Sequence, residues 1–413
     1  MTTAEGLLPE LGSRREYFDY LDGWSAGTVD ALAEGQSPRA LVKTYMLETV
    51  RDGHDPRALA DRFPRSRVRL QPVDDESLFE VHDLAAGGIV GLIEVVNERH
   101  PVLYTQLPAA QSDAWVRRTV DASPWLDRLW LAAPTLSQLW EYVKASADPG
   151  RYTRMAFEHE AFYDRDDLMA LPIDDEVDAA PNVLQAEDAP QVERRTSRSM
   201  LVERIGVISE SLERLAETYR PFHSLVQLQL PAAGRGGHVL YHDGKVTNRS
   251  DSFADHRQQV VFVTDVYRRL TEAAENLLWF SAEASSAGGG FRLRGAPVFM
   301  RFSSPLSAAT FERWLSAVFE RRPNRFRLSG YVFRLAETKA HISAIDHHLW
   351  QPLLLEVSAH HLLAVLPAGT CGNTIHRLVT NVQRFLDPAV EAWLGEERYE
   401  DAVATVVKEE LAG

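Results

Sequence analysis

The chain has a single cysteine, Cys371, among its 413 residues. One cysteine excludes an intramolecular disulfide and a zinc ribbon built from cysteines, and it is typical of proteins from reducing compartments. No segment approaches the roughly twenty apolar residues that a membrane span needs, and residues 1–6 lack the basic start and apolar core of a signal peptide. We therefore expect a cytoplasmic protein without a membrane-embedded part.

Lysine is also scarce, because only five of the 44 basic residues are lysines. The formal net charge of −15 disfavours bulk attraction to nucleic acid or to anionic lipid. This charge is unevenly distributed: residues 1–290 hold 30 basic and 46 acidic residues, whereas residues 291–413 hold 14 and 13. If the protein binds a polyanion, we expect the C-terminal part to do so.

Hydrophobic residues make up 45% of the chain, which is enough for two or three packed domains. The clearest pattern lies in residues 296–386, where alternation predicts strands and three-four spacing after Ser307 and from Asn373 predicts helices with one buried face. Ser329 and Gly330 interrupt one strand region, which indicates a kink or a β-bulge. The predicted strands are residues 297–302, 325–328, 331–335, 341–345, 352–357 and 362–366, and the second helix spans 373–386.

The first 280 residues give a looser pattern. The helices predicted there span residues 40–50, 57–63, 196–219 and 255–279, besides two short ones that begin near Ser112 and Pro134. Strands are predicted over residues 78–81, 89–96, 102–104, 126–131, 155–163 and 226–230. Asp243 and Gly244, between two apolar segments, are typical of a β-hairpin turn.

These elements predict an α+β fold of two related units, each with the order strand, helix, strands, helix and an antiparallel sheet. Over roughly residues 89–386 this order resembles the repeated unit of TATA-box-binding proteins, although no sequence motif of that family is matched. The predicted division is a helical N-terminal segment (1–77), the first part of the first unit (78–163), an acidic linker or mobile loop (164–195), long helices and a hairpin that complete this unit (196–280), a linker (281–290) and the C-terminal α/β unit (291–413).

Two groups of residues have the chemistry of metal sites. Six histidines lie late in the chain, but adjacent histidines on a strand point to opposite faces, and no metal-binding frame connects them. They are His341, His347, His348, His360, His361 and His376. Glu337 and Lys339 have the spacing of a glutamate and lysine in restriction-type nucleases, but an upstream acid on a strand is missing. Cys371 has no evident catalytic partner, and we predict no metal and no cofactor.

Arginines alternate with aromatic residues in the C-terminal unit, and this pattern suggests a binding surface. A sheet that carries both could hold phosphates and stack bases, or the arginines could instead pair with acidic residues at an interface. The candidate binding residues are Arg292, Arg294, Arg301, Arg325, Arg327 and Arg334.

The sequence thus favours a scaffold or adaptor subunit over an enzyme, with a nucleic acid or a partner protein bound at the C-terminal sheet. The alternative is a metal-dependent nuclease or hydrolase that uses Glu337 and Lys339 or the late histidines. No catalytic residue is assigned, and the oligomeric state stays open.

Overall fold

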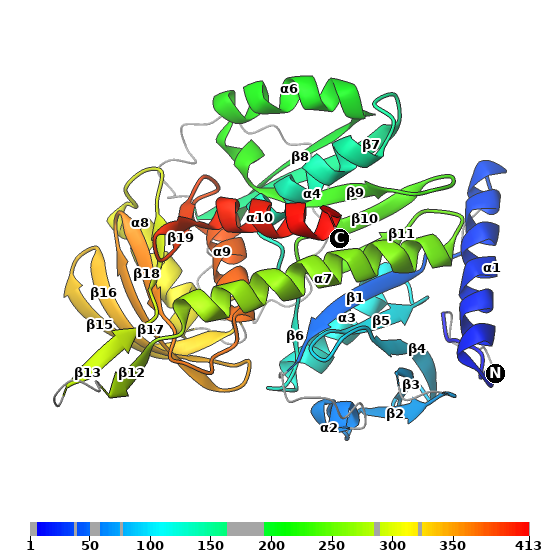
Figure 1. Cartoon of the computed structure of the whole chain (residues 1–413), viewed down its shortest axis with the longest axis horizontal. Coiled ribbons are helices and arrows are strands. Elements are labelled where there is room, and N and C mark those ends of the chain that lie inside the picture. Colours follow the sequence, from blue (N-terminus) through cyan, green and yellow to red (C-terminus); the bar gives the residue numbers. More distant parts are fainter. Residues whose placement is uncertain are drawn as a thin grey trace.

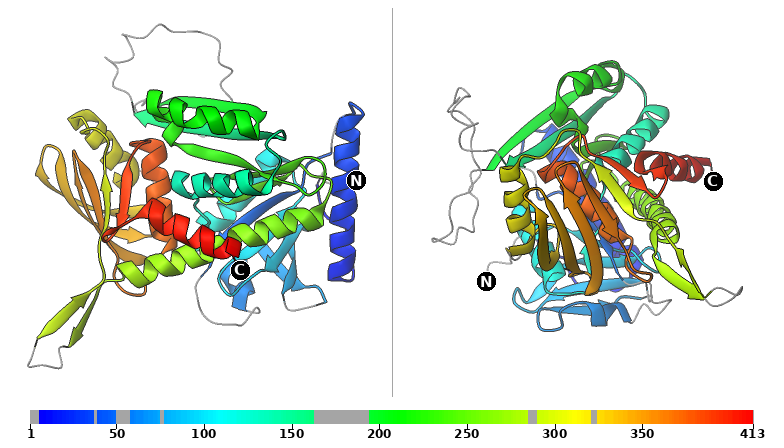
Figure 2. Two further views of the ribbon diagram at one scale, coloured as in Figure 1. Left: turned by 45° about the horizontal axis from the view of Figure 1, so that its top comes forward. Right: turned by 90° about the vertical axis from the view of Figure 1, so that its left-hand side faces the viewer.

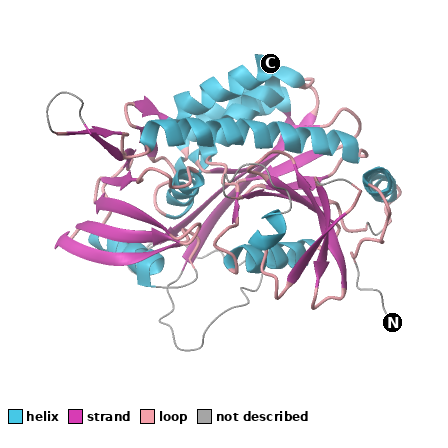
Figure 3. Ribbon diagram, turned by 60° about the horizontal axis from the view of Figure 1, so that its bottom comes forward, coloured by secondary structure: helices cyan, strands magenta, loops and turns pink. Residues whose placement is uncertain are grey.

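The computed structural model describes residues 6–36, 39–49, 58–74, 77–162, 194–284, 290–320 and 324–412. It confirms a mixed fold of helices and antiparallel sheets, in which a large sheet and a smaller one lie side by side (Figure 1). A layer of helices that includes the C-terminal one crosses one side of the strands (Figure 3). Among the described helices, none is both long and apolar enough to cross a membrane.

The first sheet has the strand order β2-β3-β4-β5-β1-β11-β10-β9-β7-β8, with the short β6 paired to β1. Its strands are β1 (Lys43–Glu48), β2 (Val68–Pro72), β3 (Leu78–Asp83), β4 (Gly88–Val95), β5 (Pro101–Thr105), β6 (Asp127–Arg128), β7 (Tyr152–Phe162), β8 (Arg194–Arg204), β9 (Leu225–Pro231), β10 (Gly237–Tyr241) and β11 (Lys245–Asn248). The β10–β11 hairpin confirms the predicted turn, and Gly244 has the positive φ of 74° that this turn requires.

β1 corrects the prediction of a helix over residues 40–50 and of a helical segment over residues 1–77. Every residue of β1 is buried, and the strand lies in the middle of the sheet. Tyr45 and Leu47 pack into the core on one face, whereas Met46 packs into the core on the other. Because β1 is buried on both faces, its apolar residues Tyr45, Met46 and Leu47 are consecutive and do not alternate with polar ones, so the strand lacks the pattern by which half-buried strands are recognised.

The helices of this part are α1 (Arg14–Ala33), α2 (Leu59–Arg62), α3 (Ala109–Asp121), α4 (Ala133–Ser146), α6 (Ile205–Thr218), the short 3-10 turn η2 (Arg220–His223) and α7 (Phe253–Leu278). The helix predicted from Thr196 begins only at Ile205, because β8 pairs with β7 up to Arg204. Exposure alternates from Arg198 to Arg204, as in a strand with one covered face. Nearly all of the predicted acidic loop 164–195 lies outside the described residues.

The second sheet has the order β15-β16-β17-β18-β14-β19-β20. Its elements are β14 (Val298–Arg301), α8 (Ala308–Leu315) continued by the π-turn η3 (Ser316–Glu320), β15 (Leu328–Ala336), β16 (Lys339–Asp346), β17 (Gln351–Ser358), β18 (His361–Val365), α9 (Asn373–Phe385), β19 (Glu391–Leu394), β20 (Glu397–Arg398) and α10 (Tyr399–Ala412). β14, the Ser307-capped helix α8 and α9 confirm elements predicted from the sequence. β19, β20 and α10 were not predicted.

The C-terminal unit is not packed by itself. Four residues of α7, which precedes it in the chain, belong to the core under the second sheet: Val266, Leu270, Ala274 and Leu278. The segment 281–290, predicted as a linker, opens with β12 (Ser281–Ala284), which pairs with β13 (Phe291–Arg294). This hairpin projects away from the rest of the molecule (Figure 2).

β15 is one strand, not two strands around a kink at Ser329-Gly330. Residues 325–327 form a turn before it, and the irregular pairing lies between Arg334 and Ala336. Gly330 serves another purpose, because a Cβ atom there would lie 2.4 Å from the carbonyl oxygen of Ser343 on β16. The glycine therefore permits close approach of the two backbones.

Candidate functional site

Helix α9 is buried on all sides between the two sheets. Its apolar residues Ile375, Leu378, Val379, Val382 and Phe385 enter the core of the second sheet, as its sequence predicts. The same amphipathic pattern predicts a solvated opposite face, but that polar face is buried against the first part of the chain. The polar side chains of α9 must therefore find partners inside the protein, because a buried polar group without one is costly.

Asp127 on β6 is a partner of two polar side chains of α9, Asn373 and Arg377. Its carboxylate is ion-paired with Arg377 of α9 and lies 3.0 Å from Nη1 of Arg327, and it accepts a hydrogen bond from Nδ2 of Asn373 at 3.0 Å. Burial by itself would raise the pKa of Asp127, but the two guanidinium groups hold it well below its ordinary value. Arg377 also pairs with Asp346 at 2.5 Å, so one arginine joins β6 to the end of β16.

A second buried group surrounds Glu48 at the end of β1. Arg99 donates to one carboxylate oxygen of Glu48, and Nε2 of His100 lies 2.7 Å from the other. Arg99 also forms two hydrogen bonds with Glu275 of α7, at 2.5 and 3.1 Å, and its Nη2 lies 3.3 Å from Sγ of Cys371. Burial raises the pKa of Glu48, but Arg99 and His100 outweigh burial and lower it to about 2. Glu48 is therefore ionised at neutral pH.

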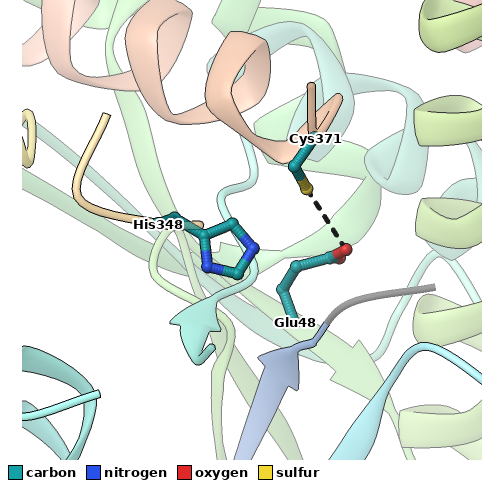
Figure 4. A group of neighbouring side chains, drawn as sticks. All are labelled: Glu48, His348 and Cys371. Atoms are coloured by element: carbon teal, nitrogen blue, oxygen red, sulfur yellow. Dashed lines mark hydrogen bonds between the residues drawn. The ribbon is translucent and has the colours of Figure 1, made fainter. Parts of the chain in front are cut away.

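Three ligand-type side chains meet at this point: Glu48, His348 and Cys371 (Figure 4). One ligand atom from each lies within 4.8 Å of the other two, and Sγ of Cys371 is 3.4 Å from Oε1 of Glu48. In the described part of the chain, neither ring nitrogen of His348 has a hydrogen-bond partner, although the side chain is fully buried. Within that same part, no other set of three histidine, cysteine or acidic side chains is arranged so closely.

The thiol and the imidazole in this group are both uncharged at neutral pH. Burial and the nearby Glu48 carboxylate raise the pKa of Cys371 well above its ordinary value. Burial also lowers the pKa of His348. A neutral imidazole with free nitrogens, a thiol and an ionised carboxylate are a set of donors suited to a transition-metal ion.

Aromatic and histidine rings extend the cluster toward α10. The rings of His100 and Tyr267 are 5.7 Å apart, and those of Tyr267 and His376 are 5.0 Å apart. His376 in turn has its Nδ1 2.7 Å from the hydroxyl of Tyr399. Burial lowers the pKa of His376 to about 3, so it is neutral in the folded protein at physiological pH.

Little in the sequence indicates this cluster, because its members come from distant segments. Glu48 and Cys371 are 323 positions apart, and His348 lies in the turn between β16 and β17. The only local signal was the Gly-Thr-Cys-Gly segment before α9, which reads as an ordinary helix start. Only the packing of the two sheets places Cys371 of this segment next to Glu48 and His348.

Among the predicted binding arginines, Arg327 is in the interior, so the expectation of a surface side chain is wrong for it. Its guanidinium donates to the carbonyl of Leu126 at 2.7 Å and pairs with Asp127. Its backbone has a φ of 53°, which is rare for a residue other than glycine. These buried contacts hold the residue in place.

The other five arginines are spread over the β12–β13 hairpin, β14, β15 and the turn before β15 rather than gathered in one patch. Three of them have acidic partners: Arg294 pairs with Glu283, Arg301 with Glu391 and Arg334 with Glu312. Arg292 lies exposed on the β12–β13 hairpin, and the guanidinium of Arg325 lies 5.5 Å from the ring centroid of Phe385. Although Arg292 and Arg294 are neighbours on β13 and Arg325 shares its turn with Arg327, the six arginines do not surround a common site in the described structure.

The late histidines also lie in different places and do not form one site. His348 and His376 lie in the buried cluster, whereas His341 and His361 flank Glu356 on the solvent side of the second sheet, at 2.8 and 3.2 Å. Lys339 pairs with the same Glu356 at 3.0 Å. Lys339 and the two histidines lower the pKa of Glu356 to about 2.

His347 contacts Ser329 and His360 is exposed. Glu337 lies in the turn between β15 and β16.

The solvent side of the second sheet, which we call the outer face, carries large apolar side chains. Tyr331, Phe333 and Leu335 of β15 are 80%, 59% and 56% exposed, and Leu354 of β17 is 52% exposed. Cross-strand pairing sets Tyr331 opposite Ser343 and Phe333 opposite His341. β15 is an edge strand: Asn324 bonds the backbone N–H and C=O of Leu328 at its start, and within the described structure no strand other than β16 pairs with β15.

A protein-family model described as "MJECL33-like protein" matches residues 10–401 of the chain. A protein of Methanocaldococcus jannaschii, named "uncharacterized protein MJECL33", is 28% identical over 165 residues. That alignment covers 40% of this chain and 38% of the relative, so the chain matches well under half of the relative's length. No solved structure matches the chain.

Proposed function

The chain belongs to the MJECL33-like protein family, and we propose that it acts as a protein-binding scaffold subunit that pairs with a second copy of itself through the edge of the second sheet. One observation carries this proposal. The edge strand β15 presents Tyr331, Phe333 and Leu335 on one face, each more than half exposed. Large exposed apolar patches on a protein surface mark interaction sites, and an unprotected edge strand is a template for a further strand.

The pattern of β15 is complementary to itself. If two copies pair antiparallel about Phe333, then Tyr331 of each copy faces Leu335 of the other, and the two Phe333 rings face each other. On the opposite face Arg334 meets Val332 and not a second arginine, so no like charges are opposed. This is an isologous two-fold contact, the commonest arrangement in soluble homo-oligomers.

A protein partner fits the outer face better than a nucleic acid does. Positive charges on this face are paired with acids: Arg301 with Glu391, Lys339 with Glu356 and Arg398 with Glu400. Neutralised charges among aromatic and aliphatic side chains are typical of protein interfaces, whereas nucleic-acid surfaces hold free positive charge for phosphates. Binding of nucleic acid remains the second hypothesis. The resemblance of the repeated unit to that of TATA-box-binding proteins also remains a proposal.

A nuclease that uses Glu337 and Lys339 has less support. Lys339 already pairs with Glu356, whose carboxylate also contacts His341 and His361. Within the described residues, Glu337 belongs to no group of three metal-ligand side chains.

Sedimentation velocity over a concentration series tests the self-pairing. We expect a dimer for the wild-type chain and a monomer for Phe333→Lys, because a charge at the centre of the strand prevents edge pairing. Phe291→Lys is the control: this phenylalanine is also exposed, 79% against 59% for Phe333, but it lies on the β12–β13 hairpin. It should leave the dimer intact.

Two results would overturn the self-pairing. A wild-type chain that is monomeric at all concentrations would do so, and so would a dimer that Phe333→Lys leaves unchanged. Binding of labelled single-stranded DNA or RNA at low salt by a monomeric chain, weakened by Phe333→Lys, would replace the second copy with nucleic acid as the occupant of this face.

A further inference from the structure

We propose that Glu48, His348 and Cys371 bind a divalent metal ion of the zinc type, and that this ion links the first sheet to the second. Glu48 comes from β1 in the first sheet, whereas His348 and Cys371 come from the second sheet's side of the cluster. The proposal is independent of the self-pairing, because it concerns the interior and not the outer face.

The spacing of the three donors suits such an ion. Ligand atoms on a tetrahedral zinc ion, with bonds of about 2.0–2.3 Å, lie roughly 3.5 Å apart. The sulfur of Cys371 is already 3.4 Å from Oε1 of Glu48, and all three ligand atoms lie within 4.8 Å of one another. A small side-chain adjustment of His348 completes the arrangement. Three protein ligands leave one position for a further donor.

The lack of hydrogen-bond partners around the buried ring of His348, in the part of the chain that is described, points to a ligand at this position. Its side chain is fully buried, and both ring nitrogens lack a hydrogen-bond partner within the described structure. A buried imidazole normally has at least one partner, because an unpaired polar atom in the interior costs free energy. A metal ion bound to one nitrogen supplies that interaction.

The charge of the site also fits a divalent ion. The carboxylates of Glu48 and Glu275 surround one cation, Arg99, so the formal charges leave one negative charge in excess while the Cys371 thiol keeps its proton. A divalent ion that displaces this proton brings the local charge to zero. Arg99 then lies 3.3 Å from the new thiolate and stabilises it.

Outer contacts already hold the three ligands in position. Arg99 and His100 fix the two oxygens of Glu48, and Oε1 of Gln351 accepts from the backbone N–H of Cys371 at 2.9 Å. Metal-binding side chains usually have such supports, and loss of a support typically lowers metal affinity about 10–100-fold.

Cobalt substitution gives a direct test, since the chain has only one cysteine. We expect Co²⁺ to bind one-to-one with the visible absorption of a tetrahedral site and with a thiolate-to-cobalt charge-transfer band. That band can arise only from Cys371, so Cys371→Ser must abolish it. Zn²⁺ should displace the Co²⁺ and raise the melting temperature of the wild-type chain.

Single substitutions distinguish metal binding at the buried cluster from metal binding on the outer face. His348→Ala should lower Zn²⁺ affinity about 100-fold or more, and His100→Gln about 10–100-fold. His341→Ala, next to Glu356 on the outer face, is the control and should change nothing. Circular dichroism without metal shows whether each variant is folded.

Absence of a charge-transfer band in the folded wild-type chain at saturating Co²⁺ would overturn the proposal. Metal binding that persists in Cys371→Ser and disappears in His341→Ala would also overturn it, because the metal would then lie on the outer face.

Discussion

Asp127 of β6 and Arg377 of α9 form an ion pair in which both side chains are almost completely excluded from solvent. The pair joins the first sheet to the helix under the second one, and Arg377 extends the link to Asp346. The interface between the two sheets is therefore organised by charge as well as by apolar packing. This explains how an amphipathic helix can be buried on its polar side.

Arg377→Ala should destabilise the protein strongly. Removing one member of a buried ion pair leaves an uncompensated charge and typically costs about 3–5 kcal/mol. Arg377 leaves two carboxylates, Asp127 and Asp346, without one of their partners, so we expect the upper part of this range. Urea unfolding followed by circular dichroism measures the change.

Arg269→Ala is the matched control for that experiment. Arg269 also pairs with two carboxylates, Glu409 and Glu410, but it does so near the surface. Its loss should cost about 1 kcal/mol or less. Similar losses for the two variants would show that burial does not set the strength of the Arg377 links.

Stability should fall below pH 6.5 through His376. Its folded pKa is about 3 against an ordinary value of 6.5, so the unfolded chain takes up a proton in this window and the folded chain does not. The free energy of unfolding therefore decreases with falling pH, by up to about 1.4 kcal/mol per unit for this residue. The groups that face the ring are Tyr267, Tyr399 and the Glu48 cluster.

His376→Gln should flatten the stability profile between pH 6.5 and about pH 4, whereas His360→Gln, at an exposed position, should leave the slope unchanged. Melting temperatures across this range provide the measurement. Below about pH 4.5 Glu48 adds a further loss, because its folded pKa of about 2 lies under its ordinary value. An unchanged slope in His376→Gln would mean that the ring is solvated in the folded state.

The fragment 291–413 should not fold by itself. It lacks the four α7 residues of its core, and it exposes the polar face of α9 with Arg377 unpaired from Asp127. We expect no cooperative thermal transition for the isolated fragment, against a cooperative one for the full chain. A fragment that melts cooperatively would restore the independent C-terminal domain predicted from the sequence.

Zinc binding at Glu48, His348 and Cys371 should release one proton per ion near neutral pH. The buried thiol keeps its proton until a metal displaces it, since burial raises its pKa. The apparent affinity should then rise about tenfold per pH unit. Calorimetry in two buffers of different ionisation enthalpy measures the released proton. Binding without proton release would exclude Cys371 as a ligand.

The sequence by itself determined several local elements in which one face is buried and the other solvated. The alternation in β16 and β17 and the three-four spacing of α7 follow from the period of a single strand or helix. The Asp243-Gly244 turn follows from the positive φ that glycine adopts easily. The same reasoning failed for β1, because a strand buried on both faces has no alternation to detect. It also failed for β8, because Leu201 near its end continues the helical spacing of Ile205 and Ile208 in α6.

Tertiary structure alone decided the site. Glu48 and Cys371 meet across 323 positions, and nothing in either neighbourhood specifies the other. The arginines show the same limit: their spacing predicted a shared surface, but the turn at residues 325–327 directs Arg327 inward to Asp127. The periodicity of a sequence indicates which side chains of a single helix or strand face the core and which face solvent. Which charges meet inside the protein depends on how separate elements pack, and that is fixed only when the two sheets enclose α9.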